Sequence, residues 1–444
     1  MQTNSLQIKL RWLQEVVRAL LQKKIAGNRS ASGSELILYG TDSGQPDAFD
    51  RFVSDNNLHP AEILTLLLAL AAHIKPDIFD NLFSELLPKP GDFPQLGGVR
   101  SQNSRVFLPT GETAVFLLAG DDLEKRFDVQ RIFSSEHFFA RKRILWLDDV
   151  APGEPLLSGK IIINPEYVEL FTLGRVSAPR FSMNFPAERL ETAMEWSDLI
   201  LGELTARQIG EIQAWLRHGD TLLHDWGMHK RVKPGYRALF HGPPGTGKTL
   251  TAALLGKHTG REVYRVDLSM VISKFIGETE KNLANLFAKA ENKDWILFFD
   301  EADALFGKRT NVRDAHDKYA NQETAYLLQR IESYNGLVIL ASNFKSNIDD
   351  AFMRRFQSVI HFPMPNTGER LLLWKKSFPE KKVDLNGLNL EYIAQRYELS
   401  GASILNIVQF CCLRALSRGD ISILESDIRE GLSKEFNKEG KIVN

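Results

Sequence analysis

The stretch Phe240 to Gly256, FHGPPGTGKTLTAALLG, determines how the rest of the chain is interpreted. Gly242 is followed by four residues and then by Gly247, Lys248 and Thr249, which is the spacing of a phosphate-binding loop. Glycines let backbone N–H groups approach phosphate oxygens, the lysine adds a charge near the β- and γ-phosphates, and the threonine hydroxyl can bind Mg²⁺. The candidate phosphate-binding residues are Gly242, Pro243, Pro244, Gly245, Thr246, Gly247, Lys248, Thr249 and Leu250.

The segments on either side of this loop support the same interpretation. Arg237 to His241 predicts a short buried strand, and Leu250 to Leu255 predicts a helix. A helix that begins after the loop directs its positive end at a bound anion. A Gly-rich turn that arose by chance is the alternative, and the order strand, loop, helix argues against it.

The composition indicates a globular protein with more than one domain. With 444 residues the chain is too long for one ordinary core, so two or three domains are expected. The formal net charge of -1 provides no global basic field for nucleic acid or an anionic membrane. The two cysteines, Cys411 and Cys412, are neighbours and suit neither a disulfide framework nor a zinc site. Together with the lack of a signal-peptide core, this favours a cytoplasmic location.

The first 180 residues are expected to form a helical and α+β docking region. Leu6 to Ile25 has apolar residues at helical spacing, and Ile63 to Ile74 is apolar enough for a buried helix but too short to cross a bilayer. Short strand-like and helical pieces follow from Arg105, without a nucleophile, a metal-ligand spacing or paired carboxylates. Pro179 to Met194 is expected to be a linker.

The alternation of strands and helices after residue 195 predicts an α/β domain with a parallel sheet covered on both faces. This domain is expected over residues 195–364, and a small all-α lid over residues 365–444. The expected strands are Arg237–His241, Val263–Leu268, Trp295–Phe299, Leu337–Ser342 and Ser358–Phe362. The expected lid helices are Gly368–Ser377, Leu390–Glu398, Ala402–Arg418 and Ser426–Phe436.

Polar residues follow two of these strands, where ligands bind in parallel sheets. Ile296 to Glu301 reads ILFFDE, so a strand delivers Asp300, a candidate Mg²⁺ ligand, and Glu301, a candidate to polarise the attacking water. An acidic pair that caps the next helix is the alternative. Asn343 ends the next apolar strand and could bind both the water and the γ-phosphate, or could be a turn residue.

The segment Asp349 to Phe356, DDAFMRRF, contains the adjacent arginines Arg354 and Arg355. They could be a solvated helix end. They could also be arginine fingers that reach the nucleotide of a neighbouring subunit, a contribution worth about 10³–10⁵ in rate.

These motifs together resemble the AAA family of ATPases. The resemblance is carried by GPPGTGKT at 242–249, FFDEAD at 298–303, ASN at 341–343 and RRF at 354–356, in the family's order of Walker A, Walker B, sensor 1 and arginine finger. SKFIGETEKNL at 273–283 resembles the family's pore-loop segment, with Phe275, Ile276 and Gly277 as its aromatic-apolar-Gly triplet. Ser400 to Ala402 resembles the sensor 2 region in its Gly-Ala version.

The resemblance implies ATP and Mg²⁺ as ligands and a homo-oligomeric ring, usually a hexamer. Arg354 and Arg355 would then act on the adjacent subunit's ATP, and Phe275 would line a central pore that grips a polypeptide. Many members separate the two arginines, so their adjacency here leaves the principal finger undecided. Leu199, Ile200 and Leu201 are candidates for the base pocket.

The ATPase segment, for example DWILFFDEADALFGKRT, is similar to bacterial AAA ATPases found with phage-tail-like contractile injection systems. SSEHFFARKRILWL in the N-terminal part is similar to the winged-helix-like region of those proteins, and its lack of basic character favours protein docking over DNA binding. We therefore expect an ATPase that remodels, unfolds or disassembles a protein partner. A DNA-directed motor or loader and a non-motor structural module are the alternatives.

Overall fold

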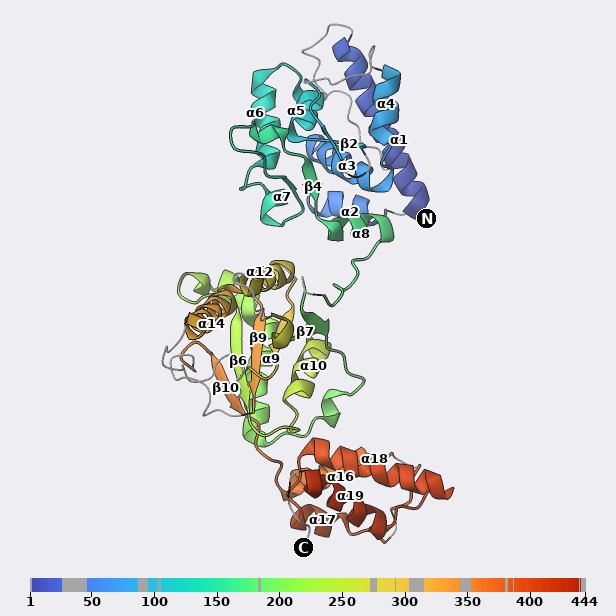
Figure 1. The fold of residues 1–444 in the computed structure, drawn as a ribbon, viewed down its shortest axis with the longest axis vertical. Coiled ribbons are helices and arrows are strands. Elements are labelled where there is room, and N and C mark those ends of the chain that lie inside the picture. The colour runs from blue at the N-terminus through green and yellow to red at the C-terminus, as the bar shows by residue number, and fades with distance from the viewer. Residues whose placement is uncertain are drawn as a thin grey trace. The chain divides into compact units, whose positions relative to one another are not determined.

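The computed structural model describes residues 2–25, 46–86, 95–101, 103, 105–182, 185–271, 278–291, 293–302, 315–343, 353–379, 382–385, 387–438 and 440. The chain separates into two compact units, residues 1–178 and residues 179–444. Figure 1 shows both units, with labels on most of their helices and strands.

The first unit is mainly helical with two small antiparallel sheets. Its α-helices are α1 (Gln2–Ile25), α2 (Ala48–Asp55), α3 (Pro60–Ile74), α4 (Ile78–Leu86), α5 (Gly111–Ala119), α6 (Leu123–Gln130), α7 (Phe138–Arg141) and α8 (Pro165–Leu173). Its strands pair as β1 (Val99–Arg100) with β2 (Phe107–Leu108) and β3 (Leu145–Leu147) with β4 (Ile161–Ile163).

The core of this unit forms around α3. Every residue of α3 from Ile63 to Ala71 is buried, as expected for a helix that is apolar on all sides. The apolar stripe of α1 packs in the same core. Lys9 of α1 is also buried, and its ammonium lies 2.8 Å from Asp47, which caps α2. A charge at such depth has to be paired, so this contact fixes where α2 meets α1.

The second unit contains one six-stranded sheet, in the order β10-β6-β9-β8-β7-β5. The five strands predicted from the sequence are parallel to one another and end within two residues of the expected positions. They are β6 (Tyr236–His241), β7 (Val263–Val266), β8 (Ile296–Phe299), β9 (Leu337–Ser342) and β10 (Ser358–His361).

The sixth strand corrects the expectation that residues 179–194 only link two domains. Within that segment β5 (Ala187–Arg189) pairs antiparallel with β7 at the edge of the sheet. Phe185, just before β5, is fully buried, with its ring 5.4 Å from Tyr264 and 5.9 Å from Trp295. Two flanking aromatic rings therefore anchor a strand that is too short to be recognised from its sequence.

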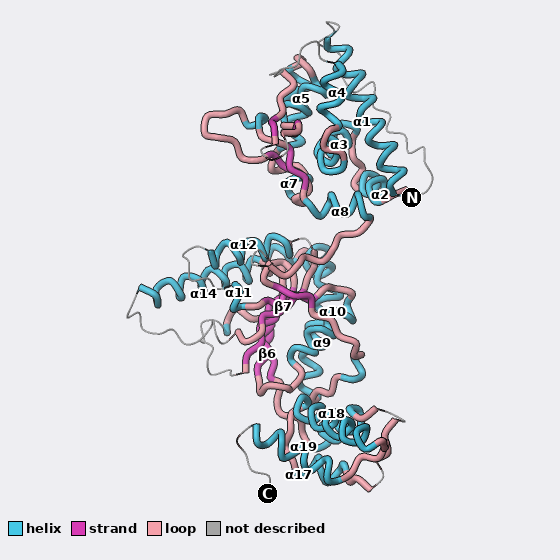
Figure 2. The backbone as a smooth tube through the Cα atoms, turned by 45° about the vertical axis from the view of Figure 1, so that its right-hand side comes forward, coloured by secondary structure: helices cyan, strands magenta, loops and turns pink. Residues whose placement is uncertain are grey.

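Helices cover both faces of the sheet (Figure 2). On one face lie α12 (Glu278–Ala290) and α14 (Ala315–Ser333), with Leu286, Phe287 and Leu327 packed in a shared core. On the other face lie α9 (Glu203–Asp220), which continues as a short π-helix over Thr221–Asp225, and α10 (Lys248–Thr259). The short α11 spans Leu268–Val271. The buried strands read as apolar runs because both of their faces are covered.

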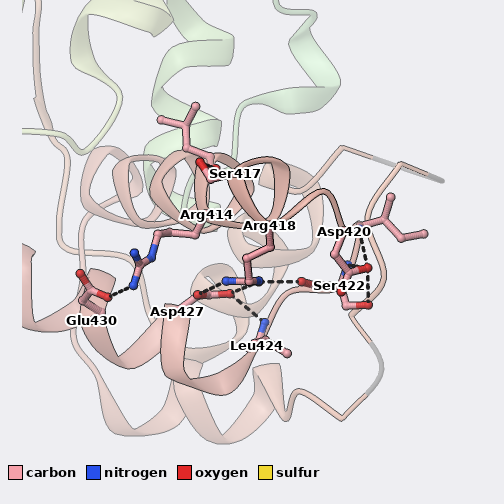
Figure 3. Close-up of polar contacts among 10 residues, drawn as sticks. Arg414, Ser417, Arg418, Asp420, Ser422, Leu424, Asp427 and Glu430 are labelled. Atoms are coloured by element: carbon pink, nitrogen blue, oxygen red, sulfur yellow. Dashed lines mark hydrogen bonds and ion pairs between the residues drawn. The ribbon is translucent and has the colours of Figure 1, made fainter.

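The C-terminal helical region consists of α16 (Thr367–Ser377), α17 (Leu390–Arg396), α18 (Gly401–Arg418) and α19 (Glu425–Lys438) around its own core. Figure 3 shows the ion pair that closes the α18–α19 turn. Two guanidinium nitrogens of Arg418 lie 2.8 and 2.7 Å from the carboxylate oxygens of Asp427, whose side chain is 3% exposed. This carboxylate also accepts the N–H of Leu424 at 3.0 Å, so it fixes the start of α19.

No helix among the described residues is both long enough and apolar enough to cross a bilayer.

Candidate nucleotide-binding site

The loop between β6 and α10 depends on glycines at two close approaches. Gly242 has φ +144°, and a Cβ there would lie 2.1 Å from the carbonyl oxygen of Phe362. Gly245 has φ +74°, and a Cβ there would lie 2.6 Å from the hydroxyl of Ser400. Residues other than glycine rarely adopt these φ values, and a side chain would have no room at either position. The loop therefore keeps an open backbone surface of the kind that holds phosphate.

Lys248 is the first residue of α10 and is buried, with 7% of its surface exposed. Its ammonium donates to the carbonyls of Gly242 at 2.7 Å and Pro243 at 2.9 Å, and to the side-chain oxygen of Asn343 at 3.1 Å. The loop is further closed by the Thr246 hydroxyl, which donates to Pro243 at 2.9 Å. The lysine charge therefore lies inside the loop at the helix N-terminus, where an anion would be favoured.

Two oxygen ligands suited to Mg²⁺ face one another beside the loop. The Thr249 hydroxyl, on the first turn of α10, lies 3.5 Å from the carboxylate of Asp300, which follows β8. Hydroxyl and carboxylate oxygens fit a hard cation that takes its remaining ligands from substrate phosphates. Among the described residues, no group of three or more His, Cys, Asp or Glu side chains is arranged to hold a metal ion by itself.

Glu301 has an unusual backbone for its residue type. It is exposed and adopts φ +51°, and its N–H donates to the Asp300 side chain at 3.1 Å. A non-glycine residue in the left-handed region carries strain of the sort found at functional sites. The chain re-enters the fold directly afterwards, because the N–H of Ala302 donates to the carbonyl of Ala341 at 2.9 Å.

Asn343 reaches the site through sheet register. β9 lies between β6 and β8, with Ser342 opposite His241 and Leu340 opposite Phe299. Residues that follow these three strands therefore gather at one edge of the sheet, which brings the amide of Asn343 to Lys248. The sequence placed Lys248 in the phosphate-binding loop and Asp300, Glu301 and Asn343 at strand ends, and the structure brings all four to this edge.

The arginine pair lies toward the opposite edge of the sheet, where the parallel strands begin. Arg354 and Arg355 precede β10, whose first residue, Ser358, pairs with Ala238 of β6, while its last, His361, pairs with His241 beside the loop. At about 3.3 Å per residue the strand alone carries the chain about 10 Å toward the loop. The two arginines therefore precede the amino end of β10, whereas the loop lies beside its carboxyl end.

The C-terminal helical region contacts the loop through the start of α18. The N–H of Ala402 donates to the carbonyl of Gly245 at 3.2 Å, and Ser400 caps α18 by accepting the N–H of Ser403 at 3.1 Å. The predicted base-pocket residue Leu199 also lies near the loop, with a methyl group 3.5 Å from where a Cβ at Gly247 would lie. The predicted pore-loop residues Phe275, Ile276 and Gly277 lie outside the described residues.

Sequence reasoning missed the residues around the arginine pair, namely Glu332, Arg237 and Gln357. Arg237 lies in a buried strand, with 4% of its surface exposed, and burial lowers the pKa of its guanidinium while nearby Glu332 opposes that shift. An arginine inside an apolar strand was the only local signal. The contacts it makes join segments about 95 and 120 residues apart, which no sequence window reveals.

Comparison with known proteins agrees with this geometry. The family described as "ATPase family associated with various cellular activities (AAA)" matches residues 238–364. A 26S proteasome regulatory subunit 6B homolog of Dictyostelium discoideum is 29% identical over 55% of this chain and 61% of its own length. A proteasome-activating nucleotidase of Methanococcus vannielii is 27% identical over 66% of this chain and 71% of its own. The A-like 1 form of the katanin p60 ATPase-containing subunit, from Rattus norvegicus, is 33% identical over 46% and 43%.

The matched segments therefore span from under half to about seven tenths of these relatives. The sequence of residues 238–364 therefore matches that of an AAA ATPase domain. The parallel core sheet with helices on both faces and the helical C-terminal region are the fold expected of it.

Proposed function

We propose that this chain hydrolyses ATP as a homo-oligomeric ring, of hexameric size, and uses the cycle to remodel, unfold or disassemble a protein partner. The observation that carries the proposal is the division of its polar residues between the two edges of the sheet. The phosphate-binding loop, Asp300, Glu301 and Asn343 share one edge, and Arg354 and Arg355 lie toward the other.

Each residue has a role that its position supports. The loop from Gly242 to Leu250 and Lys248 would hold the ATP phosphates, and Thr249 and Asp300 would hold Mg²⁺, which supplies charge neutralisation on the phosphates when bound. Glu301 would accept the proton of the attacking water, and Asn343 would orient that water and the γ-phosphate.

Arg354 and Arg355 would complete the site of the neighbouring protomer. Within one chain they come before β10, about 10 Å of strand away from the loop, so a side chain there is poorly placed for its own nucleotide. An arginine supplied in trans stabilises the charge of the transferring phosphoryl group. A complete active site would then exist only between two protomers, which makes turnover depend on assembly.

The partner is proposed to be a protein. Two of the relatives described above are named for the proteasome, and the net charge of -1 offers no field for nucleic acid. The link to a contractile injection system, the cytoplasmic location and the threading of polypeptide past Phe275 stay predictions from the sequence. None of the three relatives described above is named for such a system.

A trapping experiment tests the protein-remodelling proposal. The Glu301→Gln variant should bind ATP and hydrolyse it too slowly to release its partner, so a pull-down with ATP should retain a specific protein. Lys248→Ala, which should not bind ATP, is the matched control and should retain none. Recovery of DNA alone with the Glu301→Gln variant would contradict the proposal and favour a DNA-directed motor.

A further inference from the structure

The turn that carries the two arginines is tied to the end of α14 by an ion pair. The Arg355 guanidinium contacts a carboxylate oxygen of Glu332, which lies in the last turn of α14. The other carboxylate oxygen of Glu332 lies 3.7 Å from the Lys233 ammonium. Glu332 therefore faces two cations, and the closer one belongs to the arginine pair.

A second tie approaches the same turn from β6. The side chain of Arg237 donates to the backbone carbonyl of Glu332 at 2.9 Å. Its backbone N–H and its Nε both donate to the side-chain oxygen of Gln357, at 2.9 and 3.2 Å, and the N–H of Gln357 donates back to the Arg237 carbonyl at 3.0 Å. Because Gln357 follows Arg355 by two residues, the turn is held from α14 and from β6 at once.

Arg354 differs from Arg355 in this respect. It is exposed, and within the part of the chain that the structure describes it forms no hydrogen bond or ion pair. Among the described residues, Arg355 is thus held by a partner in its own protomer, whereas Arg354 is exposed and has none there.

We propose that Glu332 is a positioning residue: it holds Arg355 within its own protomer and thereby presents Arg354 to the ATP of the adjoining protomer. This inference rests on the proposed function, because it needs a finger that acts in trans. It assigns Arg354 as the finger and Arg355 as the strut that orients it. Orientation of this kind matters because a displacement of about 1 Å can lower a rate by about 100-fold.

The ion pair is suited to positioning more than to stability. The Arg355 side chain is 45% exposed and the Glu332 side chain 29%, and pairs this exposed contribute little to folding. Glu332→Gln should therefore fold normally, so a change in its turnover reports on the active site. Glu188→Gln is the control: it removes a carboxylate, 53% exposed, that pairs at 3.3 Å with Arg265, an arginine about as exposed as Arg355 in the same domain.

A double-mutant cycle tests the division of roles. Arg354→Ala should lower kcat by about 10³-fold or more. Glu332→Gln and Arg355→Ala should each lower kcat by about 10- to 100-fold with little change in KM for ATP, because neither touches its own nucleotide. The double variant of Glu332→Gln and Arg355→Ala should have the same kcat as Arg355→Ala alone. Glu332→Asp should have a kcat between those of Glu332→Gln and the wild type. If the fold-losses in kcat of Glu332→Gln and Arg355→Ala multiply in the double variant, the inference is overturned. A kcat for Glu332→Gln equal to that of Glu188→Gln would also overturn it.

Mixing variant chains distinguishes positioning from a merely structural role. A Lys248→Ala chain cannot bind ATP but carries an intact arginine turn, so mixed with Glu332→Gln it should give more activity than the two variants give separately. If this mixture shows no gain in ATP turnover while Lys248→Ala mixed with Arg354→Ala does, the role of Glu332 is overturned and the trans finger stands. No gain for either mixture, with Arg354→Ala fully active by itself, would overturn the trans finger and with it the proposed function.

Discussion

The contact between Gly245 and the start of α18 predicts that the loop and the C-terminal helical region bind nucleotide together. A Cβ at residue 245 would lie 2.6 Å from the Ser400 hydroxyl and 2.8 Å from the Ala402 methyl. Gly245→Ala should therefore push the start of α18 away. The hydrogen bond from Ala402 to the loop contributes about 1 kcal/mol.

Loss of this hydrogen bond would disfavour the docked arrangement by about 1 kcal/mol. If ATP binds to the docked arrangement, the affinity for ATP falls by up to about five-fold, since every 1.4 kcal/mol is a factor of about ten. Titration of the full chain with a non-hydrolysable ATP analogue, followed by calorimetry, measures this directly.

Gly260→Ala is the control for backbone strain. Gly260 has φ +69°, close to the +74° of Gly245, but a Cβ there would meet nothing within 4 Å. Both variants carry the strain of a left-handed alanine, and only Gly245→Ala disturbs α18. Equal affinities for the two variants would refute the reasoning, because the loss would then come from strain and not from the contact.

Three further outcomes follow from other contacts. Glu301→Gln should keep its affinity for ATP while turnover falls by about 10²–10⁴-fold, measured by phosphate release; a wild-type rate would contradict the role of Glu301 as base. Asp427→Asn should lower the free energy of unfolding of the C-terminal helical region by about 2–3 kcal/mol in urea at pH 7. The Arg418 side chain lowers the pKa of the Asp427 carboxyl, so this stabilisation is present above the ordinary aspartate pKa. It is lost as pH falls through the lower folded value, and a difference between wild type and Asp427→Asn that persists in strong acid would contradict the ion pair. Phe185→Ala should lower the free energy of unfolding by about 3–5 kcal/mol and expose residues near β5 to proteolysis. Phe181→Ala, at a site 42% exposed, should change little. Equal cleavage of both variants would contradict the anchoring of β5.

Much of the second unit was predictable because its strands are continuous apolar runs that end in polar residues. Once the strands are parallel, their carboxyl ends share an edge, so Asp300 and Asn343 had to lie near the loop. The residue types at those ends then limited the chemistry to phosphate, metal and water.

The parts that were missed depend on contacts distant in the sequence. β5 has only three residues, and what fixes it is the burial of Phe185 against Tyr264 and Trp295. The Glu332–Arg355 pair lies 23 residues apart across a strand, and either residue alone reads as a solvated charge. The approach of Ala402 to Gly245 joins two regions that local periodicity treats separately, and only the resemblance of Ser400 to Ala402 to a sensor 2 region pointed to the site.

The central claim is that one chain contains only part of its ATPase site and that a neighbouring protomer completes it. The most direct test is ATP turnover by an equimolar mixture of Lys248→Ala and Arg354→Ala chains. Each variant alone should be nearly inactive, whereas the mixture should regain turnover at interfaces that join an intact loop to an intact Arg354. A mixture no more active than its two components, under conditions where the chains assemble together, would contradict the claim.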